Sequence, residues 1–305
     1  MKTKLKFIPG LLLLFGVVLF TGCNDDEDAP QVDEKNIVEV AVDAGSFSIL
    51  IEAAQKAGLA EFLSTENNLT VFAPTDDAFA ALLSDLGLSS LDDIPTADLA
   101  SILTYHVIGT KAMSSDLSTG YVSTLSSYDN NNITMYIETE SGVMINNSVL
   151  VTTADIEASN GVIHVVDKVI LPPTVVNIAL ANENFTTLVQ AVVKAGLVDA
   201  LSSEGPFTVF APTNDAFDAL FAQLGVSGIN DLTAEQLTPI LLYHVVPGNV
   251  VSTELTSGEV GTLNADKNLT VDLSSGVKIN ESSVVAADIQ GANGVVHVID
   301  KVLIP

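Results

Sequence analysis

The sequence of 305 residues contains no Arg and no Trp, and it has a single Cys. Without Arg, and with 38 acidic against 11 basic side chains, the chain has too few cations for a phosphate-binding surface, so no nucleic-acid partner is expected. One Cys can form neither an internal disulfide nor a multi-thiolate metal site, and no metal or other cofactor is expected. The absence of Trp removes the commonest platform on which proteins stack sugars.

Apolar side chains, in contrast, are abundant. Hydrophobic residues make up 48% of the sequence and charged residues 16%, which is too apolar for a disordered chain and enough for a packed core. The length predicts about two domains of roughly 150 residues each.

The first 22 residues have the pattern of an export signal. Lys2, Lys4 and Lys6 precede an apolar run over residues 11–20, which is too short to span a bilayer. Residues 20–23, Phe-Thr-Gly-Cys, resemble a bacterial lipobox, although Phe20 stands where a Leu-like residue is usual. We therefore expect a lipoprotein signal peptide over residues 1–22 and a lipid, which would serve as a membrane anchor, on Cys23. An ordinary signal peptide with an incidental Cys is the alternative.

An acidic stretch follows the Cys. Residues 25–28 are all acidic and Pro30 comes close behind, so residues 23–35 are expected to form a solvated tether. The stretch resembles the acidic segment that sorts lipoproteins to the cell surface in Bacteroidetes-type bacteria, and a plain spacer is the alternative. We expect an outer-membrane lipoprotein exposed on the cell surface, with a periplasm-facing one as the other option. Removal of residues 1–22 takes away three Lys and no acid, so the net charge changes from −27 to −30.

Three blocks of sequence occur twice. TVFAPTDDAF at residues 70–79 returns as TVFAPTNDAF at 208–217, and ILTYHVI at 102–108 returns as ILLYHVV at 240–246. NGVIHVVDKVILP at 160–172 returns as NGVVHVIDKVLIP at 293–305. A repeat of about 130 residues is long enough for a core of its own, so the blocks predict tandem domains over residues 36–172 and 173–305. The first copy is longer by a polar segment at residues 126–132, which is expected to be a surface loop.

Each copy mixes helix and strand signals. Apolar residues recur at helical spacing over residues 47–57, and the first block predicts a buried strand followed by a helix capped by Thr75 or Thr213. Asp77 and Asp215 fall in the first turn of that helix. Thr233 starts a capping-box pattern, and Pro239 predicts the start of a second short helix. Strands are expected at 133–138, 143–145, 149–153 and 162–171, with the last strand in the middle of its sheet.

The three doubled blocks resemble the fasciclin domain, a module of extracellular adhesion proteins. The resemblance covers nearly all of residues 36–305 and implies an α+β fold, with each domain a wedge-like β-sandwich flanked by helices. It also implies adhesion to a surface protein or matrix polymer, without catalysis. In animal relatives the dipeptide matching the Tyr-His pairs is linked to integrin binding, so Tyr105, His106, Tyr243 and His244 are candidate partner contacts. Packing of these pairs at a helix end is the alternative.

All four His lie in the repeated blocks, and none has the spacing of a metal site. His164 and Asp167 are three residues apart in a predicted strand, so they face opposite sides and cannot act together as a catalytic pair. A structural role is therefore expected for the residues of the repeated blocks outside the Tyr-His pairs, namely Thr75, Asp77, His164, Asp167, Thr213, Asp215, His297 and Asp300. No enzyme motif is present, and the alternative to adhesion is a glycan-binding accessory protein of a polysaccharide-uptake system.

Overall fold

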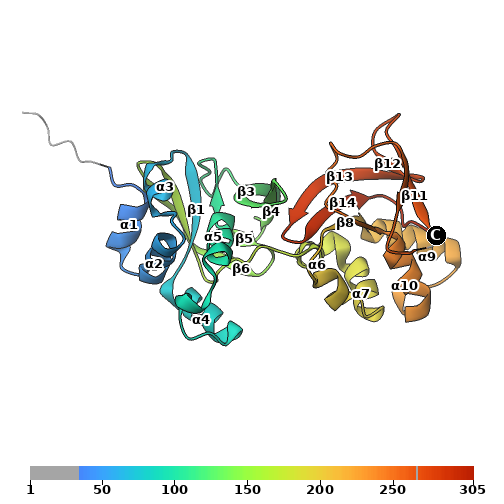
Figure 1. The fold of residues 1–305 in the computed structure, drawn as a ribbon, viewed down its shortest axis with the longest axis horizontal. Helices are drawn as coiled ribbons and strands as arrows, with labels where there is room; N and C mark the ends of the chain where they lie inside the picture. The colour runs from blue at the N-terminus through green and yellow to red at the C-terminus, as the bar shows by residue number, and fades with distance from the viewer. Residues whose placement is uncertain (1–33, 266) are drawn as a thin grey trace, which may run out of the picture. The chain divides into compact units, whose positions relative to one another are not determined.

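The computed structural model describes residues 34–265 and 267–305 and contains the same order of helices and strands twice (Figure 1). The expected signal peptide, Cys23 and most of the expected tether lie outside the described residues. The first copy contains α1 (Ile37–Ala44), α2 (Ser48–Lys56), α3 (Ala60–Thr65), β1 (Leu69–Pro74), α4 (Asp76–Leu86), the 3-10 turn η1 (Leu91–Asp93), α5 (Thr96–Tyr105), β2 (Val107–Ile108), β3 (Gly120–Tyr128), β4 (Asn131–Glu138), β5 (Met144–Ile145), β6 (Val149–Ala158) and β7 (Gly161–Val166).

The second copy repeats this order with one more 3-10 turn. It contains α6 (Val175–Leu180), η2 (Glu183–Phe185), α7 (Thr186–Lys194), α8 (Val198–Ser202), β8 (Phe207–Pro212), α9 (Asn214–Leu224), η3 (Ile229–Asp231), α10 (Ala234–Tyr243), β9 (Val245–Pro247), β10 (Gly258–Gly261), β11 (Asn268–Asp272), β12 (Lys278–Ile279), β13 (Ser282–Gly291) and β14 (Gly294–Ile299). The expected α+β architecture of two tandem domains is confirmed.

Each copy has one seven-stranded sheet. In the first copy the strand order is β2-β1-β7-β6-β5-β4-β3, and β1 with β7 is the parallel pair. The second copy has the matching order, with β8 parallel to β14. β7 and β14 are buried along their whole length between two neighbouring strands, which confirms the expected interior position. β7 ends at Val166, before the expected end at residue 171, and β14 ends at the matching Ile299. The chain leaves the sheet after these residues.

The sheet of the first copy bends at β6. β6 pairs with β5 at its start and with β7 further on, and two register shifts interrupt the second pairing. Phe72 of β1 and Val166 of β7 therefore pack in one core cluster with Ile133 and Met135 of β4. The two halves of the bent sheet thus enclose a sandwich core.

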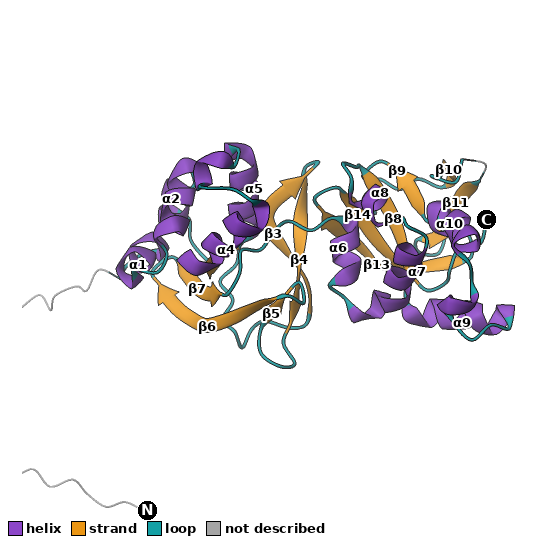
Figure 2. Ribbon diagram, turned by 90° about the horizontal axis from the view of Figure 1, so that it is seen from below, coloured by secondary structure: helices purple, strands orange, loops and turns teal. Residues whose placement is uncertain are grey.

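The other face of β1 and β7 is covered by helices (Figure 2). Val71 and Ala73 of β1 alternate with Phe72 and pack in a cluster with Ile37 of α1 and Phe47, just before α2. This period of two explains why Val71, Phe72 and Ala73 are all apolar: alternate side chains enter different cores. A further cluster fills the space among α2, α4 and α5.

The turn before β7 requires glycine. A Cβ added to Gly161 would lie 2.2 Å from the carbonyl oxygen of Leu69, and one added to Gly294 would lie 2.1 Å from that of Phe207. These distances are far below contact, so the backbone of the neighbouring parallel strand passes too close for any side chain. The repeated Asn-Gly dipeptide at the start of the third block therefore reflects this close approach as well as a turn.

The polar insertion of the first copy is not a surface loop. Residues 126–132 extend the hairpin of β3 and β4, and Ser126 is buried. Asp129 and Asn130 both have positive φ, the geometry of a type I′ turn, which is compatible with the strand twist. The extra residues were therefore absorbed as additional strand pairing, and the prediction of a loop was wrong.

Pro239 does not start a new helix. α10 begins at its Thr233 capping box and continues through Pro239 to Tyr243. A Pro at this position removes one backbone hydrogen bond, to the carbonyl of Glu235, and the rest of the helix keeps its pattern. The prediction of two short helices was wrong because the packed apolar face of α10 outweighs the loss of a single bond.

Candidate functional site

The Tyr-His pairs lie at the C-terminal ends of α5 and α10. Tyr105 is the last residue of α5 and is fully buried. Its hydroxyl donates to the carbonyl of Thr134 at 2.9 Å and accepts from the Asn146 amide at 3.0 Å. Tyr243 makes the same two bonds in the second copy, to Asn268 and from Asn280. Burial raises the pKa of Tyr105, so the phenol stays protonated.

The His of each pair is also inside the domain. The Nδ1 of His106 lies 2.8 Å from the carbonyl oxygen of Ile102, and its Nε2 accepts from the backbone N–H of Ile170 at 2.9 Å. An imidazole that accepts at Nε2 carries its proton on Nδ1, so the ring is neutral. Burial lowers the pKa of His106 to about 4, and that of His244, which makes the matching bonds, to about 4 as well.

This burial does not fit direct contact with a partner. Tyr105, His106, Tyr243 and His244 are each 5% exposed or less, and each of their polar side-chain atoms is hydrogen-bonded inside its own copy. The pairs join the end of α5 or α10 to the sandwich core and to the segment after the last strand. The alternative set out above, packing at a helix end, describes their geometry.

The His of the third block makes a second internal connection. His164 of β7 lies with Nε2 3.0 Å from the carbonyl oxygen of Ala112, and its Nδ1 accepts from the backbone N–H of Asp155 at 3.2 Å. The carboxylate of Asp155 is 3.9 Å from Nδ1, too far for a hydrogen bond to a nitrogen that is already an acceptor. His297 repeats the arrangement with Val250 and Asp288.

Asp155 and Asp288 are contacts that the sequence analysis missed. Each has positive φ at an irregularity of β6 or β13, and its carboxylate accepts from the backbone N–H and hydroxyl of Ser114 or Ser252. The hydrogen bonds from Ser114 lower the pKa of Asp155. The available signal was repetition, because Ala-Asp-Ile recurs at 154–156 and 287–289.

The first-block residues hold helix ends. The hydroxyl of Thr75 caps α4 by accepting from Ala78, and Thr213 caps α9 in the same way, as predicted. Asp77 and Asp215 are exposed in the first turns. The carboxylate of Asp76 accepts from Ser48 and Ile49 at the start of α2; burial raises its pKa, but these bonds outweigh that effect and lower it.

The acids after the last strands also accept hydrogen bonds within the fold. Asp167 accepts from the backbone N–H of Leu150 at 2.8 Å, and Asp300 accepts from Ser282 and Ser283. Burial raises the pKa of Asp300, but the bonds from both serines outweigh it and lower the pKa. These carboxylates therefore connect the segment after the sheet to β6 or β13.

Two amide side chains missed from the sequence stabilise the helical side. Asn160 accepts from the N–H of Ile37 and donates to the carbonyls of Leu63 and Glu66. Asn293 makes the same three kinds of bond, to Val175, Leu201 and Ser203. Each amide connects the turn before the last strand to the first and third helices of its copy.

In residues 34–265 and 267–305, no group of three or more His, Cys, Asp or Glu side chains is arranged to hold a metal ion. Within the same ranges, no helix has both the length and the apolar character needed to cross a bilayer.

Comparison with known proteins gives consistent matches. The family profile described as Fasciclin domain matches residues 45–172 and 183–305. Protein sll1483 of Synechocystis sp. is 51% identical over 133 residues, which are 43% of this chain and 73% of that protein. Transforming growth factor-beta-induced protein ig-h3 of Sus scrofa is 30% identical over 275 residues, which are 88% of this chain and 39% of that protein.

A solved structure shares the fold. A FAS1 domain pair from the insect cell adhesion molecule Fasciclin I matches with a TM-score of 0.54 and 18% identity, covering 86% of this chain and 98% of that chain. The profile matches take in most of the sequence, and they fall one in each copy of the repeat. This chain therefore belongs to the fasciclin-domain family and carries two fasciclin domains in tandem.

Proposed function

We propose that this chain is a non-catalytic adhesion protein of the cell surface, attached to the outer membrane through a lipid on Cys23. Its two domains contact a surface protein or a matrix polymer. The observation that carries the proposal is the tandem pair of fasciclin domains. It is supported by the similarity to ig-h3 along 88% of this chain and by the fold shared with a pair from a cell adhesion molecule.

The state of the His side chains supports a role without catalysis. Each of the four imidazoles has both ring nitrogens within hydrogen-bond distance of backbone groups. A general base needs a nitrogen that can reach a substrate, and the buried rings His106 and His244 offer none. A partner would have to bind exposed side chains of a chain that carries 38 acidic against 11 basic residues.

The anchor is tested by Cys23→Ala in cells that produce the full chain. The proposal predicts that the native protein fractionates with the outer membrane and is removed by protease added to intact cells. The Cys23→Ala protein should lose membrane association while its unfolding temperature, measured on purified protein, stays the same. Membrane association that survives the substitution contradicts the anchor, and resistance to external protease would favour the periplasm-facing alternative.

Adhesion is tested with a strain that lacks the protein and is complemented in turn with the native chain and with Cys23→Ala. Attachment to a matrix-coated surface should return with the native chain alone, because the released variant can no longer connect the cell to its partner. Equal attachment in all strains would overturn the proposal. Saturable, sugar-specific binding of the purified protein on a glycan array would favour the glycan-binding alternative.

A further inference from the structure

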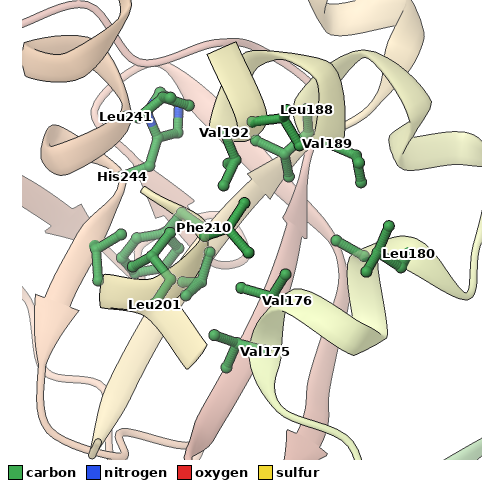
Figure 3. Close-up of a pocket in the computed structure, with 15 residues that line it drawn as sticks. Val175, Val176, Leu180, Leu188, Val189, Val192, Leu201, Phe210, Leu241 and His244 are labelled. Atoms are coloured by element: carbon green, nitrogen blue, oxygen red, sulfur yellow. The ribbon is translucent and has the colours of Figure 1, made fainter. Parts of the chain in front are cut away.

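The second domain contains an apolar pocket between its helices and its sheet (Figure 3). The pocket has a volume of about 120 Å³ and is lined by residues of α6, α7, α8 and β8, of the end of α10 and of the start of β9. Figure 3 shows the labelled side chains of Val175, Val192, Leu201 and Phe210 around it. Four helices and two strands thus leave a space that their own side chains do not fill.

Among the fifteen residues that line the pocket, His244 has the one polar side chain. Its Nδ1 lies 2.8 Å from the carbonyl oxygen of Ile240 and its Nε2 accepts from Leu303 at 2.9 Å, so the ring is neutral and both nitrogens are occupied. The pocket therefore offers an uncharged surface without an available hydrogen-bonding group. A charged ligand would lose its hydration there and gain no partner in return.

Apolar side chains also surround the opening. Leu180 and Val193 line the pocket and are 53% and 60% exposed. Val193 is notable because the matching position of the first domain, 138 residues earlier, is Gln55. Gln is the better residue for an exposed helix position on both solvation and helix propensity. The second domain therefore keeps an apolar side chain where stability alone favours a polar one.

The first domain provides an internal comparison. It has a cavity at the same place, lined by the matching residues, with a volume of about 60 Å³. Four matching lining positions differ in size: Ile37 and Ile51 are larger than Val175 and Val189, whereas Ala54 and Ala60 are smaller than Val192 and Val198. The same backbone arrangement thus accepts both the smaller and the larger residues at these positions.

We propose that the pocket of the second domain binds a small uncharged apolar group, such as one aromatic ring or a branched alkyl group of about six carbon atoms. An apolar protein cavity of about 150 Å³ stays dry and takes up benzene. The pocket described above is close to that volume and has the same kind of lining. Apolar burial without an unpaired polar group supplies the affinity.

The opening is too small to be the centre of a protein interface. Stable protein interfaces use about 20–30 residues on each side around an apolar core. Here the exposed apolar side chains at the opening are Leu180 and Val193. A small ligand that enters the pocket fits this geometry, whereas a macromolecule would find little apolar surface outside it.

The test is a titration of the full mature chain with toluene, followed through the methyl NMR signals of Val, Leu and Ile. Saturable shifts are expected at Val175, Val192 and Leu201, with much smaller ones at Ile37 and Leu63 of the first domain. Benzoate, which has the same ring and a charge, should bind at least about tenfold more weakly. Equal binding of toluene and benzoate, or toluene shifts that do not saturate, would overturn the proposal.

The first domain also supplies the variant. Val175→Ile with Val189→Ile introduces the residues that the first domain holds at Ile37 and Ile51, where Ala54 and Ala60 leave room for them. Circular dichroism checks that the variant, which keeps Val192 and Val198, is folded. Toluene affinity should fall by at least about tenfold, since one added methylene in an apolar pocket has an effect of this size. The reciprocal control, Ile37→Val with Ile51→Val, should leave toluene binding in the second domain unchanged. Undiminished binding in the filled variant would contradict the assignment, as would loss of binding in the control.

Discussion

At the scale of single residues, the repeated blocks are mostly positions where a side chain completes the hydrogen bonding of the backbone. Asn293 is a clear case, because one amide satisfies three backbone groups that belong to α6 and to the end of α8. Buried backbone groups without partners are costly, so a side chain that serves three of them at once has few substitutes. This explains why the Asn of the third block is present in both copies.

Asn293→Ala should lower the free energy of unfolding by about 2–4 kcal/mol, since it removes three bonds from a site that excludes water. Urea unfolding followed by circular dichroism measures this. Asn160→Ala should have a similar cost in the first domain. The exposed Asn230→Ala is the control and should stay within about 0.5 kcal/mol of the native protein. A cost of Asn293→Ala no larger than that of the control would show that the three bonds are not needed.

The buried His of the Tyr-His pairs make stability depend on pH. The pKa of His106 and of His244 is about 4 in the folded protein and close to 6.5 when the chain is unfolded. Between these values the unfolded chain binds the proton and the folded one does not. Stability is therefore full above pH 6.5 and falls as the pH is lowered from 6.5 toward 4, by about 3 kcal/mol for each imidazole.

Two measurements check this dependence. The free energy of unfolding in urea should be lower at pH 5 than at pH 7.5. In the native protein, the ring carbon NMR signals of His106 and His244 should show no titration above pH 5. Signals that titrate near pH 6.5 in the folded state would mean that the imidazoles are accessible to water and would remove the basis of the expectation.

At the scale of helices and strands, the sequence predicts what depends on near neighbours. Thr75 and Thr233 mark helix starts correctly because a cap acts within three residues. The strand β3 was missed because its inward positions include Thr124 and Ser126, whose hydroxyls are hydrogen-bonded inside the domain. Polar residues that find a buried partner give no apolar alternation, so only the folded structure reveals the strand.

For the candidate site as well, the sequence predicts less than the folded structure reveals. The repetition of Tyr105-His106 and of His164 identified residues that matter to the fold. It did not show whether their side chains are buried in a domain or exposed on its surface. An aromatic residue among aliphatic neighbours has the same sequence pattern in a core and at a binding face. No sequence pattern predicts the apolar pocket, because the pocket depends on the sizes of side chains that lie on elements far apart in the chain.

Pro239 permits a test at this scale, because the first domain has Ser101 at the matching position of α5. Pro239→Ser restores a backbone N–H that can reach the carbonyl of Glu235, so the second domain should gain about 1 kcal/mol. The reciprocal Ser101→Pro should lower the stability of the first domain by about 3 kcal/mol. Thermal unfolding of the two variants measures both effects. Destabilisation by Pro239→Ser would show that the ring of Pro239 makes packing contacts worth more than the missing bond.

At the scale of the whole molecule, the dominant feature is the acid excess. Removal of the expected signal peptide leaves 38 acids and eight Lys. Folding holds the charges of the two domains closer together than they are in the unfolded chain. Three exposed ion pairs, Lys35–Asp43, Lys56–Asp92 and Lys111–Glu157, act in the opposite direction. Exposed pairs contribute little, so net repulsion should govern the response to salt.

Raising NaCl from 0.01 M to 0.1 M shortens the screening length from about 30 Å to about 10 Å, so repulsion between distant carboxylates is reduced more than attraction within a close pair. The midpoint of thermal unfolding should rise by roughly 4 °C, the shift that about 1 kcal/mol produces in a domain of this size. Calorimetry of the mature chain measures it, with KCl as a control that should act equally. A midpoint that falls with NaCl would mean that the ion pairs outweigh the repulsion, and the acid excess could then no longer be regarded as a cost to the folded state.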